Sequence, residues 1–325
     1  MFQVKDFIAT EHGLVFAVVA AGLEQGRVRC FLRYLLDNGR YKKVNTAQAN
    51  DYLKKHYPQY LYYSFQLAAD LHAVPVADIV KQYQPKSQLQ SLILKSEKDS
   101  IENDLYALIL LLQQCQIDSH LWGVTGSLLL GIQNAQSDID LVCYDLTVFE
   151  QCRKAIAQLI NSNQLMALTD DDWRQSYDRR ACSLSYSDYV WHEQRKFNKA
   201  LINGRKFDIS CVTKQDELSI NTHYQKLGAI VLQVKVIDDS LTFAYPAEFI
   251  IEHETIKRVL CFTATYTGQA FAGELVEVSG LLEQSEKGEQ RIIIGSSREA
   301  DGEYIKCLNQ DLQDFKIHRI YPAIL

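Results

Sequence analysis

The stretch from Leu121 to Tyr144, LWGVTGSLLLGIQNAQSDIDLVCY, constrains the fold more than any other part of the chain. Its pattern predicts an apolar strand, a turn at Gly126 and Ser127, a short helix, and a second apolar strand with two carboxylates at its start. Because successive side chains of a strand point to opposite faces, Asp138 and Asp140 are expected on the same face. The sequence therefore predicts an acidic site beside a glycine-serine bend.

Each part of this pattern has a chemical use. Two carboxylates held a few ångströms apart repel each other and tend to raise one pKa, and a divalent cation removes that repulsion. Carboxylate oxygens are hard ligands that suit Mg²⁺. A glycine lets the backbone approach a ligand closely, and a serine hydroxyl followed by the free N–H groups of a helix can hold phosphate oxygens. Together these groups predict phosphoryl or nucleotidyl transfer.

This pattern resembles the signature of the DNA polymerase beta-like nucleotidyltransferase superfamily. That signature is Gly-Ser or Gly-Gly, a spacer of about ten residues, Asp-x-Asp on a strand, and a third carboxylate on a later strand. Gly126, Ser127, Asp138 and Asp140 match it position by position, and the resemblance extends roughly over residues 121–212. The chain is also similar, more loosely, to prokaryotic proteins known only to contain such a domain. The resemblance implies that Asp208, in a strand-like run, is the third carboxylate.

The superfamily reaction is attack of an acceptor on the alpha phosphorus of a nucleoside triphosphate, with release of pyrophosphate. The resemblance implies that Asp138, Asp140 and Asp208 are catalytic and hold one or two Mg²⁺ ions. It implies that Gly126 and Ser127 bind the beta and gamma phosphates. The acceptor stays open between RNA, protein and a small molecule. The alternative is a catalytically inactive module of this fold that binds nucleic acid or a protein partner.

A basic segment precedes the strand of Asp208. Its central part, residues 189–199, is expected to be helical. A cationic face beside a carboxylate site predicts binding of the triphosphate or of acceptor phosphates, whereas a solvated surface helix is the alternative. Side chains at helical spacing would share one face of this helix: His192, Arg195, Lys196 and Lys199.

This segment makes the interval between Asp140 and Asp208 longer than in minimal members of the superfamily. Asp178 and Asp188 therefore stay open as alternatives for the third carboxylate. The acidic run 170–172 at the start of the segment is interpreted as the cap of a helix rather than as a set of metal ligands.

Composition bounds the remaining possibilities. A chain of 325 residues is too long for one ordinary core, so two or three domains are expected. With 47% apolar and 23% charged residues, no apolar run long enough for a membrane span and no secretion signal, a cytoplasmic globular protein without a membrane partner is expected. The net charge of −6 argues against sequence-independent binding of duplex nucleic acid. The eight cysteines form no CxxC pair, which favours reduced thiols over zinc ligands.

The expected fold class is α+β, with a nucleotidyltransferase-type mixed sheet and flanking helices between two smaller parts. Residues 1–95 are predicted to form a β unit followed by a helical region. Residues 96–240 are predicted to form the catalytic domain, from a long helix at 96–117 to a strand at 228–237. Residues 241–325 are predicted to form a small antiparallel β-barrel-like domain. The sequence does not predict the oligomeric state.

Two features of the N-terminal part have alternative interpretations. Arginines alternate with apolar residues after Arg27, which predicts either a solvated outer face or a surface for nucleic acid or a partner. An aromatic group is expected to pack between small helices, with base stacking as the alternative. It comprises Tyr57, Tyr60, Tyr62, Tyr63 and Phe65.

Overall fold

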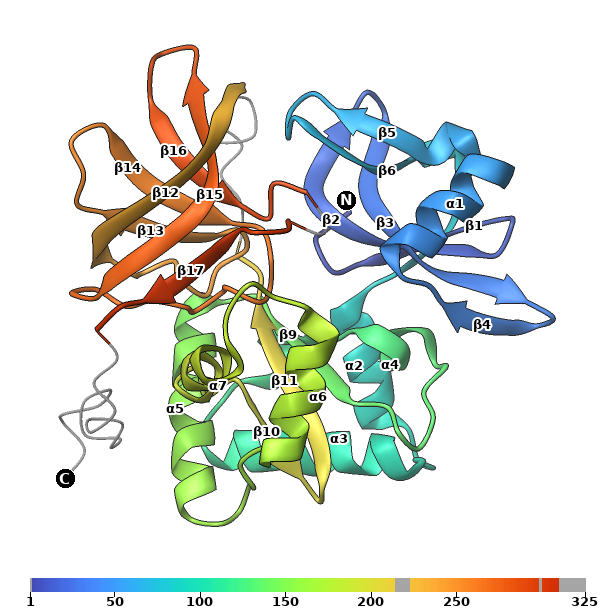
Figure 1. Ribbon diagram of the computed structural model, residues 1–325. Helices are drawn as coiled ribbons and strands as arrows, with labels where there is room; N and C mark the ends of the chain where they lie inside the picture. The colour runs from blue at the N-terminus through green and yellow to red at the C-terminus, as the bar shows by residue number, and fades with distance from the viewer. Residues whose placement is uncertain (1, 214–222, 298–299, 310–325) are drawn as a thin grey trace. The chain divides into compact units, whose positions relative to one another are not determined.

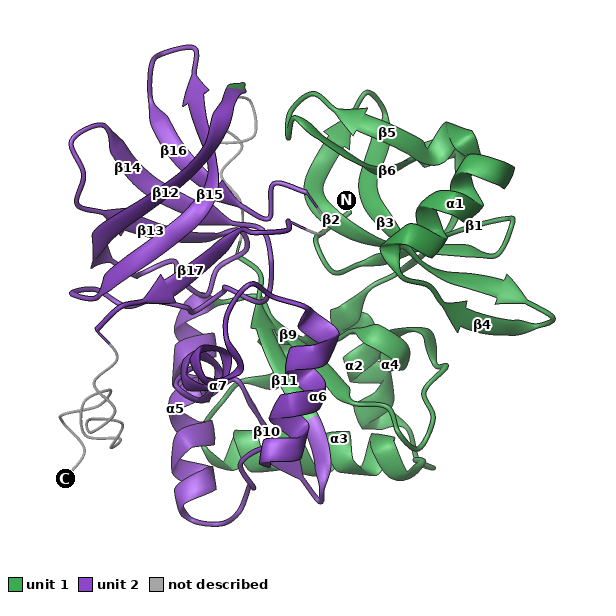
Figure 2. Cartoon of the chain, viewed as in Figure 1, with its two compact units in different colours: residues 1–145, 207–224 green, residues 146–206, 225–325 purple. Residues whose placement is uncertain are grey.

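The computed structural model describes residues 2–213, 223–297 and 300–309. The chain has an α+β fold with three β-sheets (Figure 1). It divides into two compact units, of which unit 1 comprises residues 1–145 and 207–224, and unit 2 comprises residues 146–206 and 225–325 (Figure 2). Both units therefore take residues from the segment that was predicted to form one catalytic domain.

The first sheet of unit 1 has seven strands in the order β5-β6-β3-β2-β1-β7, with β4 paired to β3. The predicted hairpin at the start of the chain is confirmed, since β2 and β3 pair antiparallel. The core of this sheet includes Phe16, whose ring meets that of Tyr60 edge-on at 5.6 Å. The strands are β1 (Phe7–Thr10), β2 (Leu14–Glu24), β3 (Arg27–Asp37), β4 (Arg40–Lys43), β5 (Leu61–Ser64), β6 (Ala69–Pro75) and β7 (Ile79–Tyr83).

Helix α1 (Thr46–His56) lies against the same core and is capped by Asn45. The Asn45 side chain accepts from the Gln48 backbone N–H at 2.9 Å, and the Gln48 side chain accepts from the Asn45 N–H. Ala49 and Leu53 are the buried residues of the helix. Short 3₁₀ turns follow at η1 (Pro58–Tyr60) and η2 (Val76–Asp78).

The prediction of a helical region up to residue 95 is wrong for residues 61–83, which form three strands. Main-chain pairing of β6 with β3 supplies a partner that the sequence alone did not reveal, and such tertiary context overrides local propensity. The aromatic group consequently divides. Tyr60 is 1% exposed in the core, whereas Phe65 is 61% exposed.

The second sheet has the order β10-β11-β9-β8, and its strand β10 belongs to unit 2. The predicted amphipathic helix is confirmed as α3, which begins after Asp99 and buries one apolar face. Helix α2 lies so close to β8 that a Cβ on Gly123 would come within 2.5 Å of the Pro85 Cβ. The elements are α2 (Pro85–Leu94), α3 (Ser100–Gln114), η3 (Ser119–Leu121), β8 (Trp122–Val124), α4 (Gly126–Leu130), β9 (Ile139–Cys143), β10 (Lys199–Ile202) and β11 (Arg205–Cys211).

Unit 2 contributes three helices, α5 (Leu146–Asn161), α6 (Asp170–Arg180) and α7 (Tyr186–Gln194). The interpretation of the acidic run 170–172 as a helix start is confirmed, because these residues form the first turn of α6. Thr169 is the N-cap, and its hydroxyl accepts from the Asp172 N–H at 3.2 Å. Negative side chains at a helix N-terminus interact favourably with the helix dipole.

The third sheet has the order β12-β13-β14-β16-β15-β17, and an additional pairing of β12 with β15 closes five of its strands into a ring. Strands β14 and β16 pair parallel and their neighbours antiparallel. This connectivity is that of a five-stranded OB barrel. The strands are β12 (Tyr224–Asp238), β13 (Ala247–Ile251), β14 (Ile256–Cys261), β15 (Leu275–Ser285), β16 (Gln290–Ile294) and β17 (Tyr304–Cys307).

The described part of the predicted C-terminal β region forms a ring of strands, but one pair in it is parallel rather than antiparallel, and the strand predicted at residues 228–237 was assigned to the wrong part of the chain. It belongs to β12, which pairs with β13 rather than with the strands of the acidic site. Residues 310–325 of the predicted third domain lie outside the described residues. Within the described part of the chain, no helix has the length and apolar composition needed to cross a membrane. All eight cysteines are free thiols.

Candidate active site

Strands β9 and β11 bring two of the three predicted carboxylates side by side. The strands pair parallel, and Asp208 lies directly opposite Asp140 in their register. Neighbouring strands of a sheet are about 4.8 Å apart, and directly opposite residues present their side chains on the same face. The residues that flank the two aspartates are buried on the other face: Ile139, Leu141, Phe207 and Ile209.

Asp138 lies one residue before β9 and is half-buried. A turn at residues 134–137 precedes it. In this turn the Asn134 N–H donates to the Ser137 hydroxyl at 3.0 Å, and the Ser137 N–H donates to the Asn134 carbonyl at 3.0 Å. Its carboxylate interacts electrostatically with that of Asp140. Asp138 therefore belongs to the same acidic site, although it is held by the turn rather than by the strand.

The predicted glycine-serine bend lies directly against Asp140. The Thr125 N–H donates to the Asp140 carbonyl at 2.9 Å, and the next residue, Gly126, has a φ of +65°. A Cβ at Gly126 would be 2.4 Å from Oδ2 of Asp140, so only glycine allows the backbone this close to the carboxylate. Ser127 follows in the first turn of α4 and is half-buried.

Burial, followed by the negative charges of Asp208 and Asp138, raises the pKa of Asp140 to about 6. Lys5 and Lys43 act in the opposite direction and lower it. Three carboxylates in so small a space interact unfavourably when all are ionised. The site therefore favours a positive charge next to Asp140.

The magnesium implied by the resemblance fits the chemistry of these side chains. Carboxylate oxygens are the preferred ligands of Mg²⁺, and a dication would remove the repulsion that raises the pKa of Asp140. Among the described residues, no three His, Cys, Asp or Glu side chains form a ready-made group that could hold a metal ion.

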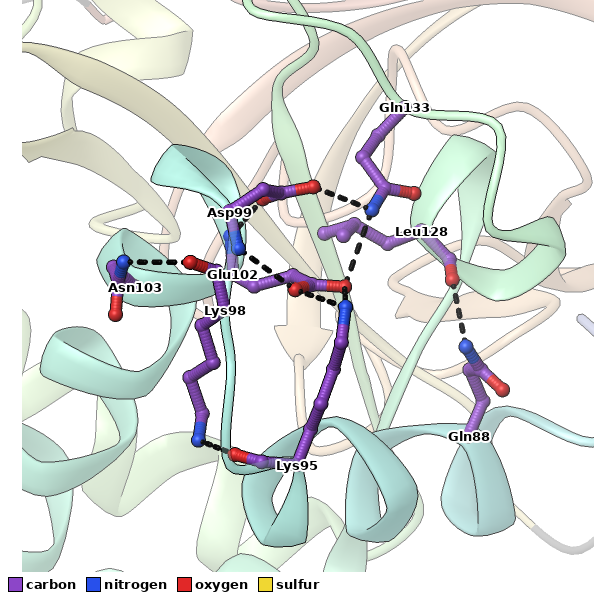
Figure 3. A network of polar contacts seen from close by, with 8 residues as sticks. All are labelled: Gln88, Lys95, Lys98, Asp99, Glu102, Asn103, Leu128 and Gln133. Atoms are coloured by element: carbon purple, nitrogen blue, oxygen red, sulfur yellow. Dashed lines mark hydrogen bonds and ion pairs between the residues drawn. The ribbon is translucent and has the colours of Figure 1, made fainter.

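A polar network ties both sides of this site to the surrounding helices (Figure 3). Glu102 of α3 is 3% exposed and accepts from the Lys95 ammonium at 2.6 Å. Gln133, in the loop between α4 and Asp138, donates to Asp99 at 2.9 Å and to Glu102 at 3.3 Å (Figure 3). Gln88 of α2 donates to the Leu128 carbonyl of α4 at 3.1 Å. The network therefore positions the helix and the loop that carry the site.

The structure places the predicted phosphate-binding cations in unit 2, whereas the carboxylates belong to unit 1. The prediction of a helix through residue 199 is wrong, because α7 ends at Gln194 and Lys199 begins β10. Their predicted role in nucleotide binding stays a prediction. Arg195 and Lys196 are 2% and 1% exposed, so in this structure they do not form a solvated cationic face.

These cations are counter-ions of two carboxylates, of which Glu193 is buried and Glu274 is partly buried. Nζ of Lys196 lies 2.5 Å from Oε1 of Glu193 and donates to the Thr265 carbonyl at 2.9 Å, and Lys199 pairs with the same carboxylate. Burial would raise the pKa of Glu193, but the two ammonium groups outweigh it and hold that pKa well below its usual range. Arg195 pairs with Glu274.

The two alternatives for the third carboxylate lie in the helices of unit 2. Asp178 is exposed in α6. Asp188 accepts from the Ser185 hydroxyl at the start of α7 and pairs with Lys306 at 2.9 Å. Both residues belong to unit 2, whereas Asp140 and Asp208 belong to unit 1.

Sequence reasoning missed three residues of the first sheet near the acidic site. Lys5 and Lys43 interact electrostatically with Asp140, and so does the Tyr34 hydroxyl. No motif marks them. A partial signal exists in β4. Lys43 is two residues after the partly buried Tyr41, so the two side chains lie on the same face of the strand.

Replacing Gly126 with Ala is expected to disable the response of the protein to Mg²⁺. The positive φ adds strain of about 1–3 kcal/mol, and the new Cβ would lie 2.4 Å from Asp140 Oδ2, so the carboxylate must move. Gly131→Ala is the matched control, because it has a φ of +68° with no atom within 4 Å of the new Cβ. We expect thermal unfolding with and without Mg²⁺ to show a rise of Tm only in the control and the wild type. Equal Mg²⁺ responses in both variants would contradict the close contact.

A curated protein of the archaeon Methanocaldococcus jannaschii, described as uncharacterized protein MJ1086, is similar to this chain. The two are 32% identical over 334 aligned positions, which cover 94% of this chain and 98% of the archaeal protein. Neither a protein-family model nor a solved structure matches the chain. The similarity therefore extends over both units and brings no activity with it.

Proposed function

The chain belongs to the family of the archaeal protein MJ1086, and from the geometry of its acidic site we propose that it is a Mg²⁺-dependent nucleotidyltransferase. The proposed reaction moves a nucleoside monophosphate from a nucleoside triphosphate to an acceptor and releases pyrophosphate. The acceptor class stays open between RNA, protein and a small molecule. The nucleotidyltransferase-type arrangement of the second sheet is part of the same proposal.

One observation carries this proposal. Asp140 and Asp208 are opposite each other on adjacent parallel strands, and the backbone of Gly126 lies against Asp140 Oδ2. A purely structural sheet gains nothing from this arrangement, because burial and the charges of Asp208 and Asp138 raise the pKa of Asp140 and reduce stability when Asp140 is ionised. A carboxylate whose pKa is raised by burial and by neighbouring carboxylates is typical of a functional site.

Each group has a defined part in the proposed reaction. Asp138, Asp140 and Asp208 would hold Mg²⁺, which supplies neutralisation of the polyphosphate and activation of an attacking hydroxyl when bound. Asp208 would complete the metal site on the side of the nucleophile and favour deprotonation of the attacking hydroxyl. The bend at Gly126 and Ser127 would let the phosphates approach the backbone closely. Most of the catalytic effect would then come from positioning and from electrostatic stabilisation.

The test is transfer of label from each of four alpha-labelled nucleoside triphosphates to components of a total cell extract, with Mg²⁺ and purified protein. We expect one class of macromolecule or small molecule to become labelled, and chelation to stop it. Asp208→Asn should lower the rate about a hundredfold or more. Asp178→Asn is the matched control, because Asp178 is exposed in α6, and it should retain the wild-type rate.

Two results would count against this assignment. Undiminished labelling by Asp208→Asn would remove the third carboxylate from the mechanism. Mg²⁺-dependent nucleotide binding without transfer to any extract component would favour the inactive binding module.

A further inference from the structure

Two lysines from the first sheet lie beside the acidic site of unit 1. Both ammonium groups interact electrostatically with the Asp140 carboxylate. Lys43 is exposed and Lys5 is half-buried, so their charges are at the surface of the unit. All three residues lie in unit 1, which also contains the whole acidic site.

The position of Lys43 follows from the pairing of β3 and β4. Lys43 lies opposite Tyr34 in the antiparallel register, so the two side chains share one face of the ladder. Tyr34 is 6% exposed and packs in a cluster with Leu129 of α4, and Tyr41 packs against the same cluster. This face of the hairpin therefore covers the helix that begins at the glycine-serine bend.

Lys5 is held in place by its backbone. It has a φ of +78° in the turn before β1, and its N–H donates to the Val18 carbonyl of β2 at 3.1 Å. Strand β1 then begins at Phe7, whose ring centroid is 6.1 Å from that of Tyr34. Both lysines are therefore anchored to the cluster that contacts α4, Lys43 by strand β4 and Lys5 by the turn before β1.

We propose that Lys5 and Lys43 bind the polyphosphate chain of the substrate, and that the first sheet thereby completes the active site of the second. This inference rests on the proposed function and assigns the phosphate contacts within it. Lysine is a compact point charge that suits phosphate oxygens. Two such charges, one from strand β4 and one from the turn before β1, lie beside three carboxylates that suit Mg²⁺. This arrangement matches a magnesium polyphosphate better than a single phosphate, because the carboxylates would bind the cation and the lysines the phosphate oxygens.

The test is calorimetric titration of the full chain with magnesium tripolyphosphate and, separately, with inorganic phosphate. The variants are Lys5→Ala, Lys43→Ala and Lys43→Arg, with Lys42→Ala as the matched control, because Lys42 is exposed on β4 and lies opposite Leu35 on the other face of the ladder. We expect each lysine-to-alanine change to weaken tripolyphosphate binding about tenfold or more. Lys43→Arg should restore most of it, and Lys42→Ala should change it less than about twofold.

The outcomes separate this inference from the proposed function. Tight tripolyphosphate binding that is unchanged in Lys5→Ala and Lys43→Ala would overturn the inference and leave the nucleotidyltransferase proposal standing. Lysine-dependent binding without any nucleotidyl transfer would support the inference and overturn the proposed reaction. Absence of magnesium tripolyphosphate binding by the wild type would overturn both. Thermal unfolding of each variant checks the fold, and Lys43→Gln replaces Lys43→Ala if the latter is destabilised.

Discussion

Asp140→Asn is expected to abolish Mg²⁺-dependent transfer while making the metal-free protein more stable. Burial and the charges of Asp208 and Asp138 raise the pKa of Asp140 from 3.8 to about 6. A shift of that size corresponds to about 3 kcal/mol of unfavourable free energy when the group is ionised. Asparagine keeps the shape and removes the charge, so we expect a gain of about 1–3 kcal/mol in unfolding free energy at pH 7.5.

The pH dependence of this difference has a definite sign. Between about pH 4 and pH 6 the folded protein keeps a proton on Asp140 that the unfolded chain has released. The contribution of Asp140 to stability therefore falls as the pH rises through this window. Urea unfolding from pH 4 to pH 8 should show little difference between wild type and variant at the acidic end and the full difference above pH 6. A variant that is less stable than the wild type at pH 8 would contradict the repulsion.

Asp140→Asn also tests whether Asp140 binds Mg²⁺. A ligand that binds only the folded state raises its stability, so Mg²⁺ should raise the Tm of the wild type more than that of Asp140→Asn. Asp178→Asn is again the control, because its carboxylate is exposed outside the acidic site. Transfer by Asp140→Asn at more than about one hundredth of the wild-type rate would remove Asp140 from the reaction.

Glu193→Gln is expected to destabilise the protein by about 3–5 kcal/mol. Glu193 is 4% exposed, and it is the shared counter-ion of Lys196, which is 1% exposed, and of Lys199. Removing the Glu193 charge deprives both lysines of this counter-ion. The buried Lys196 is the more affected, because burial already lowers its pKa to about 8. The cost comes from the uncompensated buried charge rather than from the loss of one attractive contact.

An exposed ion pair provides the comparison. Oδ2 of Asp170 lies 3.7 Å from a guanidinium nitrogen of Arg174, and the two side chains are 71% and 57% exposed. Asp170→Asn should therefore change the unfolding free energy by less than about 1 kcal/mol. Adding Lys196→Met to Glu193→Gln should recover part of the lost stability, because it removes one unpaired buried cation. Chemical denaturation of the four proteins measures both effects. Similar losses of unfolding free energy for Glu193→Gln and Asp170→Asn would show that the buried ion pairs of Glu193 contribute no more to stability than an exposed pair.

Much of the candidate site is visible in the sequence, because it depends on residues close together in the chain. The bend at Gly126 requires glycine for a positive φ and for the contact with Asp140. Strand β9 is confirmed with Asp140 in it, but it begins at Ile139, so that Asp138 lies in the preceding turn and not on the strand as predicted. Capping of α1 and α3 also depends on residues three apart, Asn45 with Gln48 and Asp99 with Glu102. The α+β class followed from these local signals.

The contributions from distant segments were decided by the tertiary structure. Whether Asp208 or another aspartate lies next to Asp140 depends on the register of two parallel strands, which no local pattern sets. Similarly, periodicity placed Arg195 and Lys196 on a solvated helix, but burial made them counter-ions of Glu274 and Glu193.

What the sequence determined by itself is thus the acidic, glycine-bordered strand and the helices with local caps, since hydrogen bonds and backbone angles there involve near neighbours. The tertiary structure alone decided which charges are buried, which strand closes the barrel, and that Lys5 and Lys43 lie near Asp140. Side-chain charge is a property of the residue, whereas its surroundings arise only when segments far apart in the chain pack together.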